Sequence, residues 1–156
     1  MNSLDINKLF REKGRTLGSV ESFTGGAFAK DITSTSGASH FFKGAFVTYA
    51  TEEKARILGI PYSLIDEYGV VSQEVAGEMA SRAKCFLNVD YCVSFTGNAG
   101  PSAMENKPVG EIHIGVAFYD KCQVFSYQLE GTRLQIQNKA IELAYELLTK
   151  LVNENN

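Results

Sequence analysis

Two apolar stretches of this chain each end in a threonine and glycine turn, and this repetition limits the folds that the chain can adopt. The first stretch, "TLGSVES" at residues 16–22, runs into "FTGG", and the second, "VDYCVSFTG" at residues 89–97, runs into "NAGP". Both have the length and apolar content of buried strands, whereas the residues between them contain helical patterns. Strands that alternate with helices in this way predict an α/β fold with a mixed, mainly parallel sheet.

The remaining segments predict helices on both faces of that sheet, that is, a three-layer α/β/α sandwich. Further strands are expected at residues 44–50, 109–119 and 122–130, and the last two form a hairpin through Asp120 and Lys121. Helices are expected at residues 3–13, 24–34, 51–59, 63–68, 72–87 and 132–151. Ser3 and Ser63 are possible N-caps, and Thr132 lies near the start of the last helix. No linker or repeat interrupts residues 1–156, so we expect one domain.

Composition and charge exclude several classes of protein. Hydrophobic residues make up 44% of the chain and charged residues 21%, which is typical of a globular domain and not of a disordered or fibrous chain. The net charge is -3 and no basic run occurs, so direct binding to nucleic acid is not expected. No apolar run approaches the roughly 20 residues of a membrane-spanning helix, and the N-terminal residues do not resemble a signal peptide. We therefore expect a cytoplasmic protein with no membrane partner.

The cysteines give no sign of a disulfide framework or a metal site. Cys85, Cys92 and Cys122 are odd in number and lack CxxC spacing. This usage suits reduced thiols in a cytosol, and metal ligation by them is not expected.

The two glycine turns are the candidate sites for ligand chemistry. In sheets of this class, ligands bind outside the carboxyl ends of the strands, where both turns lie. Glycine lets backbone N–H groups approach an anion closely, and the N-terminus of the following helix favours negative charge. Thr24, Gly25 and Gly26 therefore suit a phosphate or a developing oxyanion, although helix N-caps use the same residue types for structural reasons alone. Neither GxxxxGK[ST] nor GxGxxG occurs in the chain.

Ser22, in the first of these turns, is a candidate nucleophile, and a hydroxyl nucleophile needs a base to take its proton. His40 and His113 are the first candidates, but their sequence neighbours suggest no Ser-His-Asp arrangement. Lys54 is the alternative, because burial can lower the pKa of a lysine towards neutrality. It follows Tyr49, which is expected to end the second strand at the same edge of the sheet. A solvent-exposed helix start has the same pattern, so both interpretations stay open.

Other charged residues lie close to these turns. Lys107 and Arg133 are single cations near predicted loop or helix starts, where each can bind a phosphate or remain an exposed charge. Glu21 and Asp90 flank the turns, and they can orient Lys54 or ribose hydroxyls, or simply accept backbone hydrogen bonds.

Taken together, these segments resemble the CinA C-terminal domain family, which includes stand-alone nicotinamide mononucleotide deamidases. The resemblance spans roughly residues 4–151. Its marks are "ESFTGG" at 21–26, "GAFVTYATEEKARILGI" at 44–60, "YGVVSQEVAGEMA" at 68–80, "SFTGNAGP" at 94–101 and "KPVGEIHIGVAF" at 107–118. An ordered set of this kind is far more specific than one glycine turn.

The resemblance implies a nicotinamide-nucleotide amidase, a C–N hydrolase that converts nicotinamide mononucleotide to nicotinate mononucleotide and ammonia in pyridine nucleotide salvage. The family's serine, tyrosine and lysine correspond to Ser22, Tyr49 and Lys54. In this hypothesis Lys54 activates Ser22 directly or through Tyr49, an acyl-enzyme forms, and backbone N–H groups of the "TGG" turn stabilise the oxyanion. The residues expected to hold the substrate are Thr24, Gly25, Gly26, Thr96, Gly97, Gly100, Lys107 and Arg133. No metal or other cofactor is implied, and self-association into a homo-oligomer is expected.

The chain departs from the family pattern at several positions around the expected site. Phe23 replaces a usual cysteine, Asn98 replaces a usual isoleucine, and Thr96 stands where serine is common. "SAMEN" at residues 102–106 replaces glycines, and Thr132 replaces the aspartate of a usual "GDR" element. These changes retain the expected catalytic residues but alter the surroundings of the substrate.

Two other functions stay open at this point. The changes at residues 98–106 and at Phe23 suit a nucleotide-binding or regulatory module that has lost efficient turnover. The family's historical competence label suggests an interaction protein in DNA uptake or repair, although the acidic net charge argues against direct contact with DNA. Some family members carry an additional N-terminal nucleotide-hydrolysing domain, and this chain, which starts at Met1, is expected to lack it.

Overall fold

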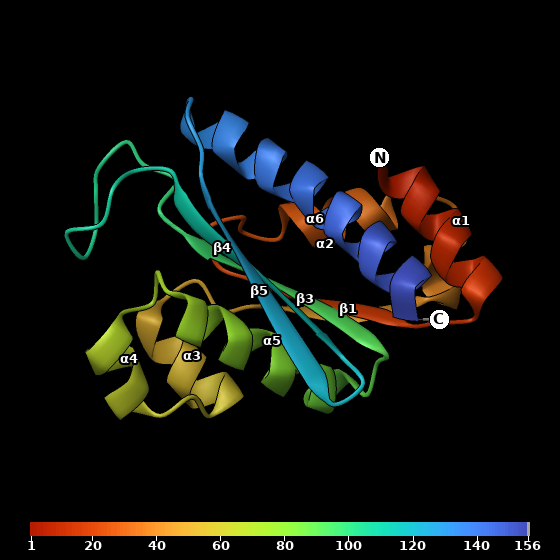
Figure 1. Ribbon diagram of the computed structural model, residues 1–156, viewed down its shortest axis with the longest axis horizontal. Helices are drawn as coiled ribbons and strands as arrows, with labels where there is room; N and C mark the ends of the chain where they lie inside the picture. Colours follow the sequence, from red (N-terminus) through yellow and green to blue (C-terminus); the bar gives the residue numbers. More distant parts are fainter. Residues whose placement is uncertain (156) are drawn as a thin grey trace.

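A five-stranded sheet lies between two layers of helices in the computed structural model, which describes residues 1–155 (Figure 1). The strands are β1 (Leu17–Glu21), β2 (Phe42–Val47), β3 (Tyr91–Gly97), β4 (Glu111–Phe118) and β5 (Lys121–Gln128), and their order in the sheet is β2-β1-β3-β4-β5. β1 pairs in parallel with β2 and β3, whereas β4 is antiparallel to both of its neighbours. All strands except β4 therefore share one direction, which confirms the predicted mixed, mainly parallel sheet.

The helices divide between the two faces of the sheet, as predicted for a three-layer sandwich. One face is covered by α1 (Ser3–Lys13), α2 (Ala27–Thr33) and α6 (Arg133–Asn155), and the other by α3 (Thr51–Leu58), α4 (Tyr62–Tyr68) and α5 (Gln73–Leu87) (Figure 1). Side chains of β3 alternate between the two cores, because Tyr91, Val93 and Phe95 pack in the first and Cys92 in the second. Burial on both faces explains why the central strands β1 and β3 lack exposed polar side chains, and their polar residues Ser19, Glu21, Ser94 and Thr96 are themselves buried. None of the helices within residues 1–155 has the length and apolarity needed to span a membrane.

The first helix has a different N-cap from the one predicted. Asn2, not Ser3, is the N-cap: its side-chain oxygen accepts from the Asp5 amide at 3.0 Å, and the Asp5 carboxylate accepts from the Asn2 amide at 2.9 Å. This reciprocal pair satisfies two amides at the helix start, which a single serine hydroxyl does not do.

The start of α4 also differs from the prediction, whereas the start of α5 agrees with it. α4 follows Pro61, so Ser63 lies inside the helix and not at its cap. Proline suits a helix start because its φ is fixed near the helical value and it has no N–H to leave unpaired. The predicted helix over 72–87 is α5, and its first predicted residue, Ser72, is the N-cap, since its hydroxyl accepts from the Val75 amide at 3.2 Å.

Three segment boundaries near the turns are corrected by the structure. β2 ends at Val47, so Tyr49 lies beyond the strand and not at its end. α2 begins at Ala27, so residues 24–26 form the turn before the helix and not its first turn. The hairpin between β4 and β5 turns one residue earlier than predicted, at Tyr119 and Asp120, because Lys121 already belongs to β5.

Candidate active site

A cavity of about 310 Å³ opens at the carboxyl ends of β1 and β3. Its walls come from the turn after β1, the connection between β2 and α3, the loop after β3 and the first residue of α6. Most of the predicted site residues line it, namely Ser22, Tyr49, Lys54, Thr96, Gly97, Gly100 and Arg133. Thr24, Gly25, Gly26 and Lys107 are not among the residues that line it.

The Lys54 side chain meets Ser22 inside this cavity. Its Nζ lies 3.0 Å from Ser22 Oγ and 2.6 Å from the carbonyl oxygen of Thr48, and the residue is only 1% exposed. Burial lowers the pKa of Lys54 to about 8, while the negative charges of Glu105 and Glu52 oppose this shift. About a tenth of the lysine is therefore neutral at pH 7, and a neutral amine at this distance can accept the Ser22 proton.

The sheet itself fixes the backbone of Ser22. This residue directly follows β1, and its amide still donates to the Phe95 carbonyl of β3 at 2.9 Å. On the other side of β1, the Thr48 amide donates to the Glu21 carbonyl at 2.9 Å. Ser22 and Thr48, whose carbonyl anchors Lys54, therefore both lie one residue beyond the last paired residues of their strands. Sequence patterns do not reveal the role of Thr48, because any residue type supplies a backbone carbonyl.

Tyr49 occupies a different position from the one that a proton relay requires. Its hydroxyl accepts from Arg133 at 2.9 Å, and the residue is 59% exposed. Its backbone carbonyl accepts from Lys54 Nζ at 3.4 Å. No hydrogen bond joins its hydroxyl to Ser22 or Lys54 among the described residues. The direct contact between Lys54 and Ser22 is therefore the shorter route for the proton.

Glu21 organises the first glycine turn. It is fully buried at the end of β1, and its carboxylate accepts hydrogen bonds from one hydroxyl and three amides. The donors are Thr24 Oγ1 at 2.7 Å, and the amides of Gly26 at 3.2 Å, Phe28 at 3.0 Å and Ala29 at 3.0 Å. Glu21 therefore caps α2, which is the backbone role among its predicted alternatives.

This capping changes which amides are available to an anion. The Gly26 amide is bound to Glu21, and the Gly25 amide donates to the Ser22 carbonyl at 3.0 Å. The two glycine amides of the predicted oxyanion site are thus occupied. The amides of Phe23 and Thr24 bind no acceptor within residues 1–155, and they directly follow the nucleophile. They replace the glycines as the candidate oxyanion donors.

The second glycine turn contributes buried polar groups. The Thr96 hydroxyl donates to the Val70 carbonyl at 2.6 Å, so its proton supports the wall, while its oxygen can still accept a hydrogen bond. Asn98 is only 2% exposed, and its Nδ2 donates to the Lys107 carbonyl at 3.2 Å. This bond directs the other end of the amide, Oδ1, away from that carbonyl, and Oδ1 accepts no hydrogen bond within the described residues. Asn98 thus brings an acceptor to the cavity lining.

The two predicted phosphate-binding cations have different surroundings. Arg133 lines the cavity, and its guanidinium donates to the Gly100 carbonyl at 2.7 Å as well as to Tyr49. Lys107 instead donates to the carbonyls of Tyr68, at 2.8 Å, and Val71. Lys107 is therefore a structural cation outside the cavity, and Arg133 is the candidate for an anionic group of a ligand.

The histidines and Asp90 lie outside the cavity. His113 bonds to Ser126 at 2.7 Å and to Glu111 at 2.9 Å, on the strands β4 and β5. His40 bonds to a backbone carbonyl in its own turn. Asp90 accepts from the Thr16 amide at 2.8 Å, at the opposite end of β1 from Ser22. None of these groups is positioned to serve Ser22.

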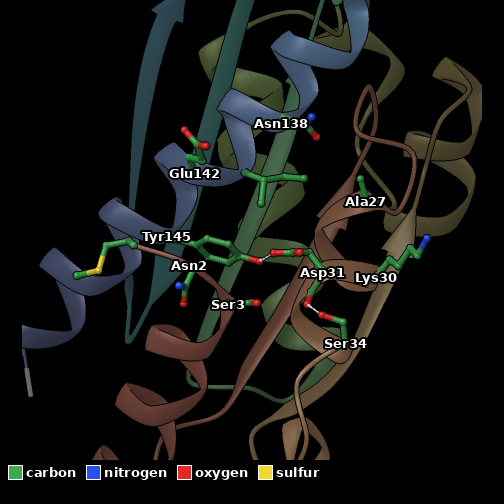
Figure 2. A pocket seen from close by; sticks show the side chains of 11 residues that line it. Asn2, Ser3, Ala27, Lys30, Asp31, Ser34, Asn138, Glu142 and Tyr145 are labelled. Atoms are coloured by element: carbon green, nitrogen blue, oxygen red, sulfur yellow. Dashed lines mark hydrogen bonds between the residues drawn. The ribbon is translucent and has the colours of Figure 1, made fainter.

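A larger cavity, of about 470 Å³, lies among the start of α1, α2 and α6 (Figure 2). Its central contact joins Tyr145 and Asp31, which share a hydrogen bond of 2.5 Å (Figure 2). Burial and this hydrogen bond both raise the pKa of the tyrosine. A tyrosine in this state is a poor nucleophile, and no hydroxyl in this cavity is bonded to a basic amine. The cavity around Ser22 therefore remains the candidate active site.

Comparison with known proteins shows the family of this chain. The profile described as CinA C-terminal domain matches residues 2–152. Proteins named competence-damage inducible protein from Streptococcus equi subsp. equi and Lactiplantibacillus plantarum are 39% and 40% identical over 151 residues. These matches cover 95% and 96% of this chain but 36% of each relative, so the chain spans about a third of their length.

Solved structures agree with the fold. Competence damage-inducible protein A from Klebsiella pneumoniae superposes with a TM-score of 0.96 at 21% identity, over 99% of this chain and 96% of that one. The protein CihA from Agrobacterium tumefaciens has a TM-score of 0.91 at 28% identity, over 97% and 93% of the two chains. The profile match across nearly the whole sequence confirms the predicted resemblance, and the chain belongs to the CinA C-terminal domain family.

Proposed function

We propose that this protein is an amidohydrolase that converts nicotinamide mononucleotide to nicotinate mononucleotide and ammonia. The observation that carries the proposal is the 3.0 Å contact between Lys54 Nζ and Ser22 Oγ in a cavity at the carboxyl edge of the sheet. A buried lysine beside a serine is a known arrangement for nucleophilic attack on an amide. Membership of the CinA C-terminal domain family supports this class of chemistry.

In the first half of the proposed reaction, neutral Lys54 takes the proton of the Ser22 hydroxyl as its oxygen attacks the carboxamide carbon. The amides of Phe23 and Thr24 stabilise the negative oxygen of the tetrahedral intermediate, each by about 3 kcal/mol. The Lys54 ammonium then gives its proton to the departing nitrogen, the C–N bond breaks, and ammonia leaves. In the second half, Lys54 takes a proton from the water that attacks the acyl-enzyme. It then returns this proton to Ser22 Oγ as the ester bond breaks and the acid leaves.

Arg133 is the proposed partner of the 5'-phosphate. It lines the cavity, and its guanidinium is held by two oxygens, those of Gly100 and Tyr49. A positioned guanidinium suits a phosphate because it presents several donors in a fixed plane. Gly97 and Gly100 form the wall beside it. Gly25 and Gly26 act indirectly by shaping the turn that carries Ser22, whereas Thr24 acts through its amide.

The decisive experiment measures ammonia release from nicotinamide mononucleotide, with the acid product identified by mass, for the parent and for Ser22→Ala. We expect turnover in the parent and a loss of about a thousandfold or more in the variant, with mononucleotide binding retained. An inactive parent would overturn the proposal, and an active variant would require attack by water without a serine nucleophile.

A silent nucleotide-binding module is the second candidate, and Phe23 is the observation that favours it. This bulky side chain lines the cavity directly beside the nucleophile and is only 4% exposed. A ring in this place narrows the space for a pyridine amide. A thermal shift with the mononucleotide, combined with no ammonia at high protein concentration, would favour this candidate.

A further inference from the structure

Two oppositely charged side chains join the loop after β3 to the segment before α5. The Glu105 carboxylate accepts from the amide of Val70 at 2.9 Å and from that of Val71 at 3.0 Å. Lys107 donates to carbonyls of the same segment, and its Nζ lies 3.7 Å from the Glu105 carboxylate. We call this pair, Glu105 and Lys107, the loop bridge. The bridge provides hydrogen-bond partners for two amides, those of Val70 and Val71, and for two carbonyls, those of Tyr68 and Val71. These residues lie about 35 positions away in the sequence.

The backbone is shaped specifically for this bridge. Glu105 and Asn106 both have a φ of 57°, a left-handed conformation that is uncommon for residues with side chains. Gly69 has a φ of 78°, and a Cβ on this glycine would lie 2.7 Å from a Glu105 carboxylate oxygen. Uncommon conformations of this kind persist where the surrounding contacts require them, and they gather at functional sites.

The bridge reaches the candidate active site through its neighbours. Val70, whose amide is bound by Glu105, lines the cavity, and its carbonyl accepts the Thr96 hydroxyl. Met104, next to Glu105 in the chain, lines the same cavity. Displacing the Glu105 carboxylate would therefore loosen two residues of the cavity lining, Val70 and Met104.

We propose that Glu105 is a positioning residue of this site: by binding the 68–71 segment it fixes the cavity wall beside Ser22 and Lys54. The effect on catalysis rests on the proposed amidohydrolase function, whereas the effect on the wall does not. The charge of Glu105 also acts on Lys54, together with that of Glu52, and the other ionisable groups in the cavity lining are Tyr49 and Arg133.

The first test needs no substrate. Amide hydrogen exchange at Val70 and Val71 is measured by NMR in the parent, in Glu105→Gln and in Glu52→Gln. Glu105→Gln replaces one charged acceptor oxygen by an amino group, so exchange at these positions should accelerate about tenfold or more. Glu52→Gln removes a charge near Lys54 without touching the segment, so exchange there should stay within about twofold of the parent. Equal exchange in the parent and Glu105→Gln would overturn the proposal.

A second variant, Glu105→Asp, separates the effect of side-chain length from the effect of charge. It also replaces Glu105→Gln in the test if that variant fails to fold. Glu105→Asp keeps the negative charge but shortens the side chain, so exchange at Val70 and Val71 should again accelerate. In assays of ammonia release, both Glu105 variants should raise KM about fivefold or more. Only the Gln variant, like Glu52→Gln, should move the rise of activity with pH to lower pH, because a lost negative charge disfavours the Lys54 ammonium.

Failure of the proposed function and failure of the positioning role of Glu105 give different results. A parent that releases no ammonia overturns the proposed function, while the exchange rates still decide whether Glu105 holds the wall. A parent that is active, with an unchanged KM in both Glu105 variants, overturns the positioning role alone.

Discussion

The two glycine turns look alike in sequence but are held in different ways. In the first, Glu21 is fully buried and binds donors no more than eight residues away, so the turn and the start of α2 form a local unit. In the loop that continues from the second, the Glu105 side chain is 28% exposed and accepts from amides that lie 34 and 35 residues away. A turn with local hydrogen bonds suits a candidate nucleophile that must not move, whereas a loop bonded to a distant segment keeps its position only while those distant contacts hold.

If this division is correct, damage to Ser22 in the first turn, or to Lys54 of α3 that contacts it, should abolish chemistry. Lys54→Met retains the length and apolar stem of the side chain but removes the amine that contacts Ser22. We expect kcat to fall by about a thousandfold, with KM changed by less than about threefold, because a general base acts mainly in the transition state. Steady-state ammonia release measures both constants. A variant with the parent's kcat would exclude Lys54 as the base.

The first turn should also carry more folding energy than the second. Glu21→Ala leaves several donors at the start of α2 without their acceptor, so we expect a loss of about 3 kcal/mol in the free energy of unfolding. Glu105→Ala should cost about 1 kcal/mol, because water can replace a partly exposed acceptor. Urea denaturation compares the two variants, with the exposed Glu12→Ala as the control near zero. Equal losses for Glu21 and Glu105 would contradict the comparison.

Substitution of a residue that is expected to bind the substrate should change KM. Arg133→Met removes the guanidinium of the cavity lining, and we expect KM to rise about thirtyfold while kcat changes little. Arg56→Met is the matched control, because Arg56 pairs with Glu53 on the exposed surface of α3. Titration with inorganic phosphate gives an independent readout of the same site. An unchanged KM would assign the phosphate to another group.

The pH dependence of activity tests whether Lys54 acts as the base for Ser22 of the first turn. Because the base must be neutral, activity should rise as pH increases through the Lys54 pKa of about 8. From pH 7 to pH 8 we expect kcat/KM to increase about fivefold, and to level off at higher pH. A profile that falls over this interval would mean that the ammonium form of Lys54 is the active one.

The smallest expected effect concerns Asn98, in the second turn. Asn98→Ile removes the bond to the Lys107 carbonyl and the acceptor that Oδ1 offers to the cavity. We expect a rise of about fivefold in KM for the mononucleotide, since one neutral hydrogen bond contributes about 1 kcal/mol. Isothermal titration with Ser22→Ala as the background separates binding from turnover. Tighter binding in the isoleucine variant would mean that the polar group opposes the ligand.

The sequence was sufficient for the fold and for the position of Ser22 at the carboxyl edge of the sheet, because both depend on where strands end. The pairing of Ser22 with Lys54 was expected from the family resemblance, since the residue pattern alone left the role of Lys54 open. Parallel strands bring their carboxyl ends to one edge, so residues that directly follow them are expected to meet. The directions of Tyr49 and Lys107 were not predictable in the same way. These long side chains follow partners distant in the chain, Arg133 for the tyrosine and carbonyls of residues 68–71 for the lysine.

The choice of the two glycine amides as oxyanion donors was not supported by the structure for a different reason, whereas the Thr24 amide of the same turn stays a candidate. Glycines at 25 and 26 predict a turn open to an anion, but the sequence does not indicate that the preceding glutamate already occupies one of their amides. The resemblance to the family supplied the expected role of each residue. The competition for backbone hydrogen bonds became visible only with atomic positions.

The hydrogen bond that the Ser22 amide donates to the Phe95 carbonyl constrains which insertions and deletions the chain can accept. Side chains alternate between the two faces of a strand, so a one-residue insertion in β1 that shifts its pairing with β3 would turn the Ser22 side chain away from Lys54. Deletions in β3 carry the same risk. Side chains of the loop from Asn98 to Gly110 do not alternate between two faces of a strand, so a change in its length does not reverse their directions. Insertions and deletions between related chains should therefore accumulate in this loop. They would change the range of ligands and leave the reaction itself intact.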